Sequence, residues 1–101
     1  MQRYTTETRK EWEVLGGSER SQAALMTVAP GGSVGGPDNR HEDSDQWLLV
    51  LEGTGEAIVG GKRTELSKGV LVLVEAGESH EIKNTGDGPL RTLDLYAPPE
   101  Y

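Results

Sequence analysis

The chain has 101 residues and a formal net charge of −7, and it contains no cysteine. This length fits one domain with a single core, and without cysteine the fold has neither disulfides nor thiolate metal ligands. The sequence has no basic run of the kind that binds nucleic acid or anionic lipid. It also has no stretch near the roughly 18 apolar residues that cross a membrane. We therefore expect neither a nucleic-acid partner nor a membrane.

The N-terminal third leaves two assignments open. Residues 1–10 lack the apolar segment of a secretory signal, which favours a cytoplasmic protein. Residues 6–15 fit a short helix and a strand about equally well. Residues 22–28 predict a strand. Residues 31–38 are rich in Gly, Pro and Asp and predict a loop or an edge segment.

The middle of the chain predicts further short strands. Residues 46–52 form an apolar strand, and residues 56–59 and 62–66 flank Gly60-Gly61, which is a strong signal for a two-residue hairpin. The run of Val and Leu over residues 70–74 is typical of a strand that is buried on both faces.

The last third completes an all-β pattern. A turn with Gly77 at a positive φ leads to His80, which begins a strand expected beside the apolar run. Residues 90–96 alternate between apolar and polar side chains, and Pro98-Pro99 ends regular structure. About eight strands with turn signals every 8 to 12 residues predict a sandwich or barrel. A closed jelly roll hides the strand edges and often encloses a small-ligand cavity.

The two histidines, His41 and His80, occupy equivalent places in this pattern. Each stands at the entry of a predicted strand, so the two imidazoles are expected to share one site inside the barrel. If they bind one metal ion, their rings must lie within about 6 Å of each other and face away from bulk water.

At this point the sequence resembles the cupin family. The second cupin motif is usually written G-x5-P-x-G-x2-H-x3-N, and four of its positions are matched here at the right spacing, with Glu75 where proline is usual. The matching residues are Gly69, Gly77, His80 and Asn84. The resemblance implies a single cupin domain over residues 1–101, with its barrel core at about 22–97.

The first cupin motif, usually G-x5-H-x-H-x3or4-E-x6-G, is matched less completely. Counting back from Gly53 places Gln46 at the glutamate position, His41 at the second histidine position and Asn39 at the first. The leading glycine position falls on Ser33. The match is therefore degenerate at its start and good at its end.

The resemblance implies a metal site in which four side chains face inward, namely Asn39, His41, Gln46 and His80. Such nitrogen and oxygen donors suit a divalent transition metal, either Zn, Fe, Mn, Ni or Cu. The two amides are neutral, so a weakly held metal or an empty site stays open. So do the alternatives that the histidines only bond backbone carbonyls and that Asn39 caps a turn.

Acidic and aromatic residues near this site have functional and structural interpretations. Asp43 and Asp45 are either solvated loop acids or metal ligands in a shifted register. Asp94 and Tyr96 share a face of the last strand and are the candidate catalytic pair, with Asp94 as general base if the cavity raises its pKa. The same pair resembles small cupins that linearise unsaturated uronates, in which an arginine follows the paired prolines where this chain has Glu100.

The remaining large side chains are assigned by alternation. Trp12 and Trp47 are expected as core or dimer contacts, with Trp47 facing away from the cavity, whereas Arg40 and Arg91 are expected at the surface. The family resemblance also implies a homodimer.

Two functions remain open. The first is a metal-dependent enzyme, such as an isomerase, decarboxylase or dioxygenase, that acts on a small polar or carbohydrate-like acid. The second is a non-catalytic module that binds a small-molecule ligand with little or no metal. A scaffold whose pocket has lost its chemistry is a third, less favoured interpretation.

Overall fold

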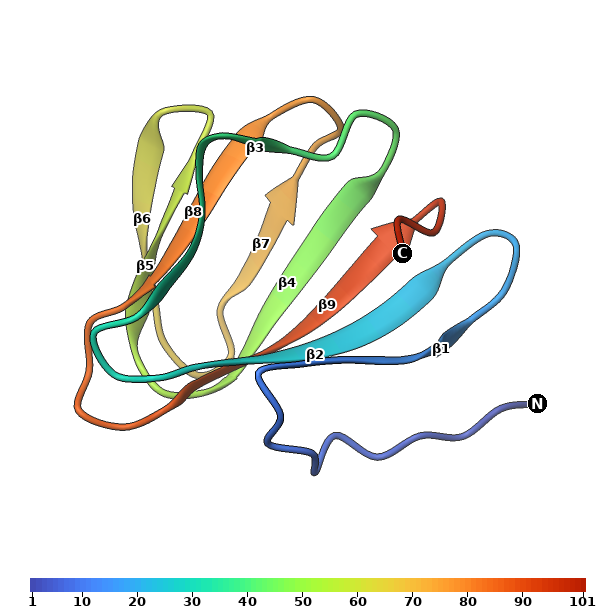
Figure 1. The fold of residues 1–101 in the computed structure, drawn as a ribbon, viewed down its shortest axis with the longest axis horizontal. Coiled ribbons are helices and arrows are strands. Elements are labelled where there is room, and N and C mark those ends of the chain that lie inside the picture. The colour runs from blue at the N-terminus through green and yellow to red at the C-terminus, as the bar shows by residue number, and fades with distance from the viewer.

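The chain folds into two antiparallel β-sheets that face each other (Figure 1). The computed structural model describes the backbone throughout and the side chains of residues 1–36 and 41–101. The first sheet has the strand order β1-β2-β9-β4-β7 and the second β3-β8-β5-β6. This backbone contains β1 (Trp12–Gly17), β2 (Gln22–Val28), β3 (Ser33–Arg40), β4 (Asp45–Glu52), β5 (Gly55–Val59), β6 (Lys62–Leu66), β7 (Leu71–Val74), β8 (Ser79–Asn84) and β9 (Leu90–Ala97). The all-β jelly roll expected from the sequence is confirmed.

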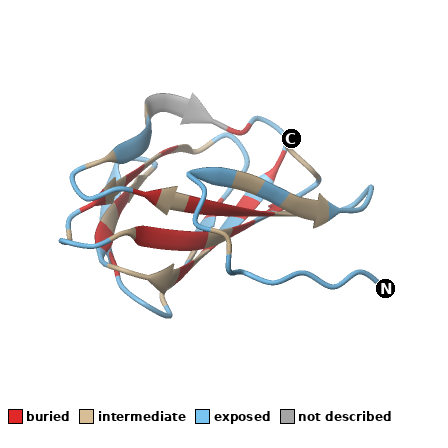
Figure 2. Ribbon diagram, turned by 60° about the horizontal axis from the view of Figure 1, so that its bottom comes forward, coloured by how far each residue is buried: buried red, intermediate tan, exposed pale blue. Residues whose placement is uncertain are grey.

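The core lies between the two sheets because side chains alternate along each strand. On β4, Leu48 and Val50 are buried, whereas Trp47 is 42% exposed on the opposite face, as the alternation predicts. Figure 2 shows buried segments on the facing strands and an exposed N-terminal segment. The buried apolar cluster consists of Met26, Val28, Leu48, Val50, Ala57, Leu66, Ile82 and Leu90.

The predicted hairpin joins β5 to β6. Gly60 and Gly61 have φ values of 57° and 81°, and Val59 pairs with Lys62 across the turn. Positive φ at two successive positions favours glycine strongly, because a Cβ atom would clash with the backbone there.

The prediction that residues 70–74 are buried on both faces is wrong. β7 is the edge strand of the five-stranded sheet, and Leu71 and Leu73 are 55% and 37% exposed, while Val74 is buried. His80 also does not lie beside β7, because β8 pairs with β3 and β5 in the other sheet. The turn at Gly77, whose φ of 85° is positive as expected, therefore carries the chain from one sheet to the other.

The structure settles both segments that the sequence left open. Residues 6–10 form no helix, and β1 begins at Trp12 and pairs with β2. Residues 33–36 of the Gly-rich segment pair with β8 as a strand. In the part of the chain that the structure describes, no helix has the length and apolar character needed to cross a membrane.

Arg91 is buried rather than at the surface, which corrects the sequence-based expectation. Its exposure is 8%, and its guanidinium donates hydrogen bonds to the backbone carbonyls of Thr6 and Thr8. A second guanidinium nitrogen lies 3.8 Å from a carboxylate oxygen of Glu52. The N-terminal segment thus covers a side chain that alternation along β9 alone would leave in water.

Candidate functional site

A cavity of about 270 Å³ lies between the two sheets. The five-stranded sheet contributes Met26, Gln46 and Tyr96, and the four-stranded sheet contributes His80 and Ile82. Its described lining is completed by Glu11, Trp12, Val34, Gly35, His41 and Tyr101. Side chains from distant parts of the sequence therefore meet at one place.

The two histidines converge in this cavity as expected. The centroids of the His41 and His80 rings are 4.8 Å apart, and the two residues are only 5% and 8% exposed. His80 is fixed within β8, and the backbone carbonyl of His41 accepts a hydrogen bond of 2.7 Å from the amide of Gly77. The turn that carries the second motif therefore also anchors the histidine of the first.

The environment of His80 suits a metal ligand. Burial lowers the pKa of His80 below 6.5, and the nearby His41 lowers it further, whereas the backbone of Glu78 opposes the shift in part. Its Nδ1 atom is buried and has no hydrogen-bond partner among the described residues. A neutral imidazole keeps the free lone pair that a metal ion requires.

Gln46 contributes an oxygen to the same cavity. It lies on β4 opposite Tyr96 of β9, is 3% exposed, and its Oε1 atom has no hydrogen-bond partner among the described residues. A buried acceptor without a partner costs about 1–3 kcal/mol. This atom is therefore available to a group that donates a hydrogen bond or carries a positive charge, such as a water molecule, a ligand or a metal ion.

Asp94 and Tyr96 share the inward face of β9, but only Tyr96 is among the residues that line the cavity. Asp94 is completely buried, and its Oδ1 accepts a hydrogen bond of 3.2 Å from Thr92. Burial raises the pKa of Asp94 to about 7, and contacts with Thr92 and Gln46 reduce that shift. Burial also raises the pKa of Tyr96, which keeps its hydroxyl protonated. Tyr96 is thus placed as a hydrogen-bond donor.

The loop acids next to His41 do not enter the cavity. Asp43 is exposed, and Asp45 is exposed with its Oδ1 accepting a hydrogen bond of 2.9 Å from the amide of Ala76. Asp45 therefore stabilises the turn before Gly77. Asn39 and Arg40, which were assigned to the cavity and to solvent, lie outside the residues whose side chains are described.

Several residues of the site were not predicted as such, among them Glu11, which lines the cavity. Trp12 and Tyr101 line the cavity, with ring centroids 5.0 Å apart. Glu100 contacts the site directly, because its Oε1 lies 3.0 Å from Nδ1 of His41. No strand pattern follows Pro98-Pro99, so alternation could not place Glu100 or Tyr101. Trp12 was assigned to the core or to a dimer interface instead.

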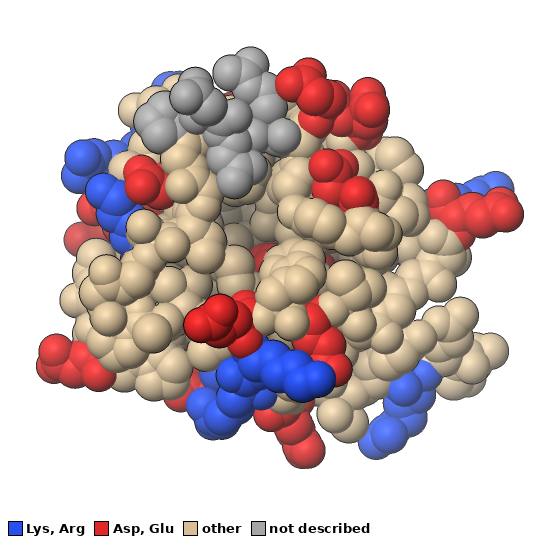
Figure 3. Space-filling view, in the orientation of Figure 1, with Lys and Arg blue, Asp and Glu red and all other residues tan. Residues whose placement is uncertain are grey.

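The donor set fits a divalent transition metal, but its donors are all neutral and therefore bind such an ion comparatively weakly. Among the described side chains, no three His, Asp, Glu or Cys residues are placed to hold one ion. A metal here would be held by His41, His80 and the amide oxygen of Gln46, which is a neutral and comparatively weak set. The described lining contains no Lys or Arg. Figure 3 shows acidic side chains over one face of the molecule with basic ones among them.

Comparisons with known proteins agree with this architecture. A cupin domain model matches residues 24–96. The crystal structure of the Bacillus halodurans protein BH2720 superposes with a TM-score of 0.88 at 30% identity, covering 94% of this chain and 75% of that one. The structure of KdgF from a Halomonas species, at 22% identity and a TM-score of 0.79, covers 87% of this chain and 77% of that one. This second match shows a shared fold.

Sequence relatives include an oxalate-binding protein of Thermotoga maritima, which is 36% identical over 70 residues, covering 69% of this chain and 56% of the relative. The Bacillus subtilis protein YrkC is 30% identical over 86 residues, covering 79% of this chain and 45% of the relative. The chain thus spans about half the length of these two relatives. On the strength of the domain match, the jelly-roll topology and the histidine pair, the chain belongs to the cupin family.

Proposed function

We propose that this cupin holds a divalent transition metal through His41, His80 and Gln46 and acts on a small polar or carbohydrate-like acid. The observation that carries the proposal is that two buried imidazoles and an amide oxygen with no partner among the described side chains meet in one cavity. The reaction would be of the isomerase, decarboxylase or dioxygenase type. Zn, Fe, Mn, Ni and Cu all suit these donors.

The charge of the pocket supports a metal-dependent mode of binding. Glu11 lines the cavity, Glu100 lies beside it, and the described lining has no cationic side chain from Lys or Arg. An anionic ligand would be repelled unless a positive charge were added to the site. The relative named as an oxalate-binding protein supports a small acid as the ligand. A cavity of about 270 Å³ also favours a small molecule.

The chain's own residues would divide the remaining work. A bound metal supplies a Lewis acid that polarises an oxygen of the ligand. Tyr96 lines the cavity in its protonated form and would donate a hydrogen bond or a proton. Trp12 and Tyr101 would exclude water from one side. Asp94 is proposed as general base, and loss of turnover in Asp94→Asn with unchanged metal binding would support that role.

Metal analysis of protein purified without a histidine tag tests the proposal. We expect one metal per chain in the wild type and none in the double variant His41→Ala, His80→Ala. The exposed neighbour Glu42 provides a control, because Glu42→Gln should keep the metal. Metal at about 100 times its Kd should stabilise the wild type by about 2.7 kcal/mol. Metal-free wild type whose melting temperature ignores Zn, Ni and Mn would refute the proposal.

A non-catalytic ligand-binding module is the second candidate. The neutral donor Gln46 and the absence of Asp94 from the described cavity lining favour it. The discriminating measurement is a titration of the metal-loaded protein with oxalate or an unsaturated uronate, followed by NMR. Saturable binding with no product after prolonged incubation favours the module, whereas product formation favours the enzyme.

A cytoplasmic location is also proposed, and cell fractionation tests it.

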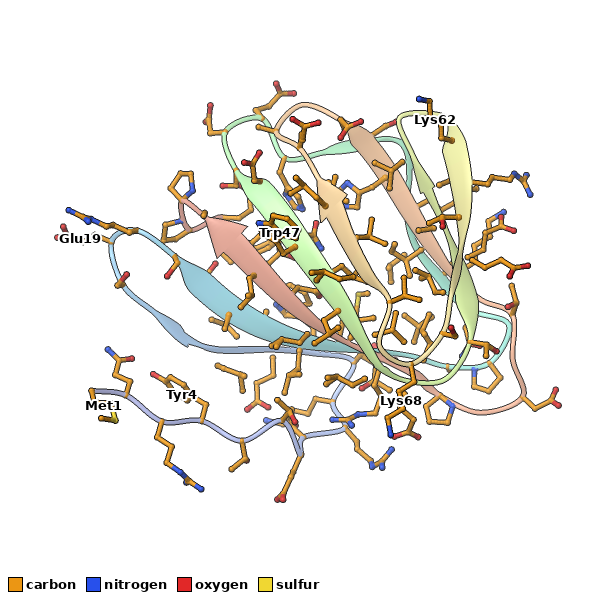
Figure 4. The ribbon with its side chains drawn as sticks, turned by 180° about the vertical axis from the view of Figure 1, so that it is seen from behind. Met1, Tyr4, Glu19, Trp47, Lys62 and Lys68 are labelled. Carbon is orange, nitrogen blue, oxygen red and sulfur yellow. The ribbon has the colours of Figure 1, made fainter. Side chains whose placement is uncertain are left out.

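We propose that the chain assembles as a homodimer. The outer face of β4, β7 and β9 is apolar, with Trp47 lying over β4 (Figure 4). Its exposed large apolar side chains are Trp47, Leu71, Leu73 and Leu95. A second copy of the chain offers an equally apolar face under two-fold symmetry. Light scattering should give a dimer for the wild type and a monomer for Leu73→Lys, with Val14→Lys on β1 as the control.

A further inference from the structure

We propose that Glu100 is a positioning residue of the metal site, which fixes the imidazole of His41 so that its Nε2 lone pair is the one available to a metal. This inference rests on the proposed function and adds a residue to it. The contact that carries it is the distance of 3.0 Å between Glu100 Oε1 and His41 Nδ1. The His41 side chain is buried, with an exposure of 6%, and the Glu100 side chain is partly buried, with an exposure of 26%.

The chemistry of imidazole explains why such a contact matters. A neutral imidazole has one protonated nitrogen and one free lone pair, and the hydrogen bond made by one nitrogen decides which is which. A carboxylate that accepts from Nδ1–H places the lone pair on Nε2 and makes the ring a better ligand. His41 lines the cavity and its ring centroid is 4.8 Å from that of His80, so a lone pair on Nε2 would be offered at the site that the two rings share.

The segment that carries Glu100 is held by contacts from separate strands and loops. Gln22 of β2 accepts hydrogen bonds from the amides of Glu100 and Tyr101, at 3.3 Å and 2.9 Å, and donates one of 2.6 Å to the carbonyl of Tyr101. Ser44 donates a hydrogen bond of 2.7 Å to the carbonyl of Pro98. Residues 98–101 therefore form a strap over the cavity that places the Glu100 carboxylate before any metal arrives.

Aromatic packing fixes the other end of the strap. The Tyr101 ring makes edge contacts with Tyr96 and His41, with centroid distances of 5.2 Å and 5.9 Å. The ring of His41 thus has a carboxylate near Nδ1 and two nearly perpendicular aromatic neighbours, Tyr96 and Tyr101, which restrict its rotation about χ2. This preorganisation compensates in part for the weak amide donor Gln46.

The test is a titration of the metal-free protein with Co²⁺, whose visible absorption reports the ligand environment. Glu100→Leu should weaken Co²⁺ binding by roughly 10 to 100-fold. Glu100→Gln should weaken it less, because an amide oxygen still accepts from Nδ1–H. Glu42→Gln removes the same charge from an exposed neighbour of His41 and should leave the Kd unchanged. Gln22→Leu should also weaken Co²⁺ binding, because Gln22 holds the backbone of both Glu100 and Tyr101.

A second readout does not depend on metal. The chain has two histidines, so a long-range ¹H–¹⁵N spectrum above the imidazole pKa resolves both rings. We expect His41 in the Nδ1–H form in the wild type and a mixture of tautomers in Glu100→Leu, while His80 is unchanged. An unaltered tautomer, or unchanged or tighter Co²⁺ binding in Glu100→Leu, overturns this inference and leaves the proposed function standing. A wild type that binds no metal overturns both.

Discussion

At the scale of single residues, the motif positions have separate physical tasks. Asn84 is buried, and its side-chain amide donates hydrogen bonds to the carbonyls of Val28 and Gly88, at 2.9 Å and 2.8 Å. Its Oδ1 accepts a hydrogen bond of 2.9 Å from the amide of Gly86. The asparagine of the second motif therefore ties the end of β8 to β2 and to the following turn, and it has no part in the cavity chemistry.

Asn84→Ala should destabilise the fold without reaching the metal site. The change leaves two carbonyls and one amide without their partner, which should cost about 2–4 kcal/mol in the free energy of unfolding. Urea denaturation measures this loss, and Thr85→Ala at the exposed neighbouring position should change stability by about 0.5 kcal/mol or less. A loss below about 1 kcal/mol would show that water replaces these bonds at little cost.

Asp94 should make the metal-free protein less stable as the pH rises. The folded state binds its proton with a pKa of about 7, raised from 3.8, so the folded state holds more protons than the unfolded state between these values. Stability contributed by the protonated acid is present at low pH and is lost as the pH rises through about 7. The difference amounts to up to about 4 kcal/mol.

The comparison that isolates this effect is Asp94→Asn, measured in the presence of a chelator. Its stability should lack the decrease that the wild type shows between about pH 4 and pH 7. Parallel stability curves for the two proteins over this range would mean that Asp94 titrates near its ordinary pKa.

Much of the site follows from the sequence at this scale, and part of it does not. Motif spacing predicted that His41, Gln46 and His80 share one cavity, and all three line it although Gln46 and His80 lie on strands of different sheets. Glu100 could not be found this way. Its position depends on hydrogen bonds with Gln22 and on ring contacts of Tyr101, and neither leaves a periodic signal.

At the scale of the elements, the positions of the strands were predicted better than the burial of their faces and side chains. The run over residues 70–74 contains the strand Leu71–Val74. A run of Val and Leu does not show whether the outer face of such a strand meets water or another protein chain. The exposed Leu71 and Leu73 show that the described part of the chain does not itself cover the second face. The burial of Arg91 escaped prediction for a related reason, since the segment that covers it has no regular structure.

Arg91 should act as the clamp of the N-terminal segment. Arg91→Met removes the hydrogen bonds to the carbonyls of Thr6 and Thr8, so this segment should detach while the sandwich persists. We expect faster trypsin cleavage at Arg9 and Lys10 and a loss of about 1–2 kcal/mol in stability. The control is Arg63→Met, which removes an exposed ion pair with Glu56 and should change neither. Unchanged cleavage in Arg91→Met would show that other contacts hold the segment.

At the scale of the whole molecule, the fold depends on pairings between distant parts of the chain. β2 pairs with β9 from Gln22 to Val28, and β3 pairs with β8. The second and last strands, β2 and β9, must therefore meet before the cavity closes. Such non-local pairing raises the entropic barrier to folding.

The protein should consequently fold in milliseconds to seconds rather than microseconds. Stopped-flow refolding followed by the fluorescence of Trp12 and Trp47 measures the rate, because the two tryptophans lie on different strands of the five-stranded sheet. Refolding within the dead time of mixing would indicate that local hairpins, such as β5–β6, determine the barrier instead.

The strap of residues 98–101 has a practical consequence for anyone who fuses a sequence to this chain. The Tyr101 ring is 5.9 Å from the His41 ring, so any peptide joined after Tyr101 starts at the rim of the proposed metal site. A polyhistidine extension at that end would bring six or more extra imidazoles within reach of the same ion. An affinity tag is better placed before the exposed Met1, where its histidines add no metal ligands next to the proposed site.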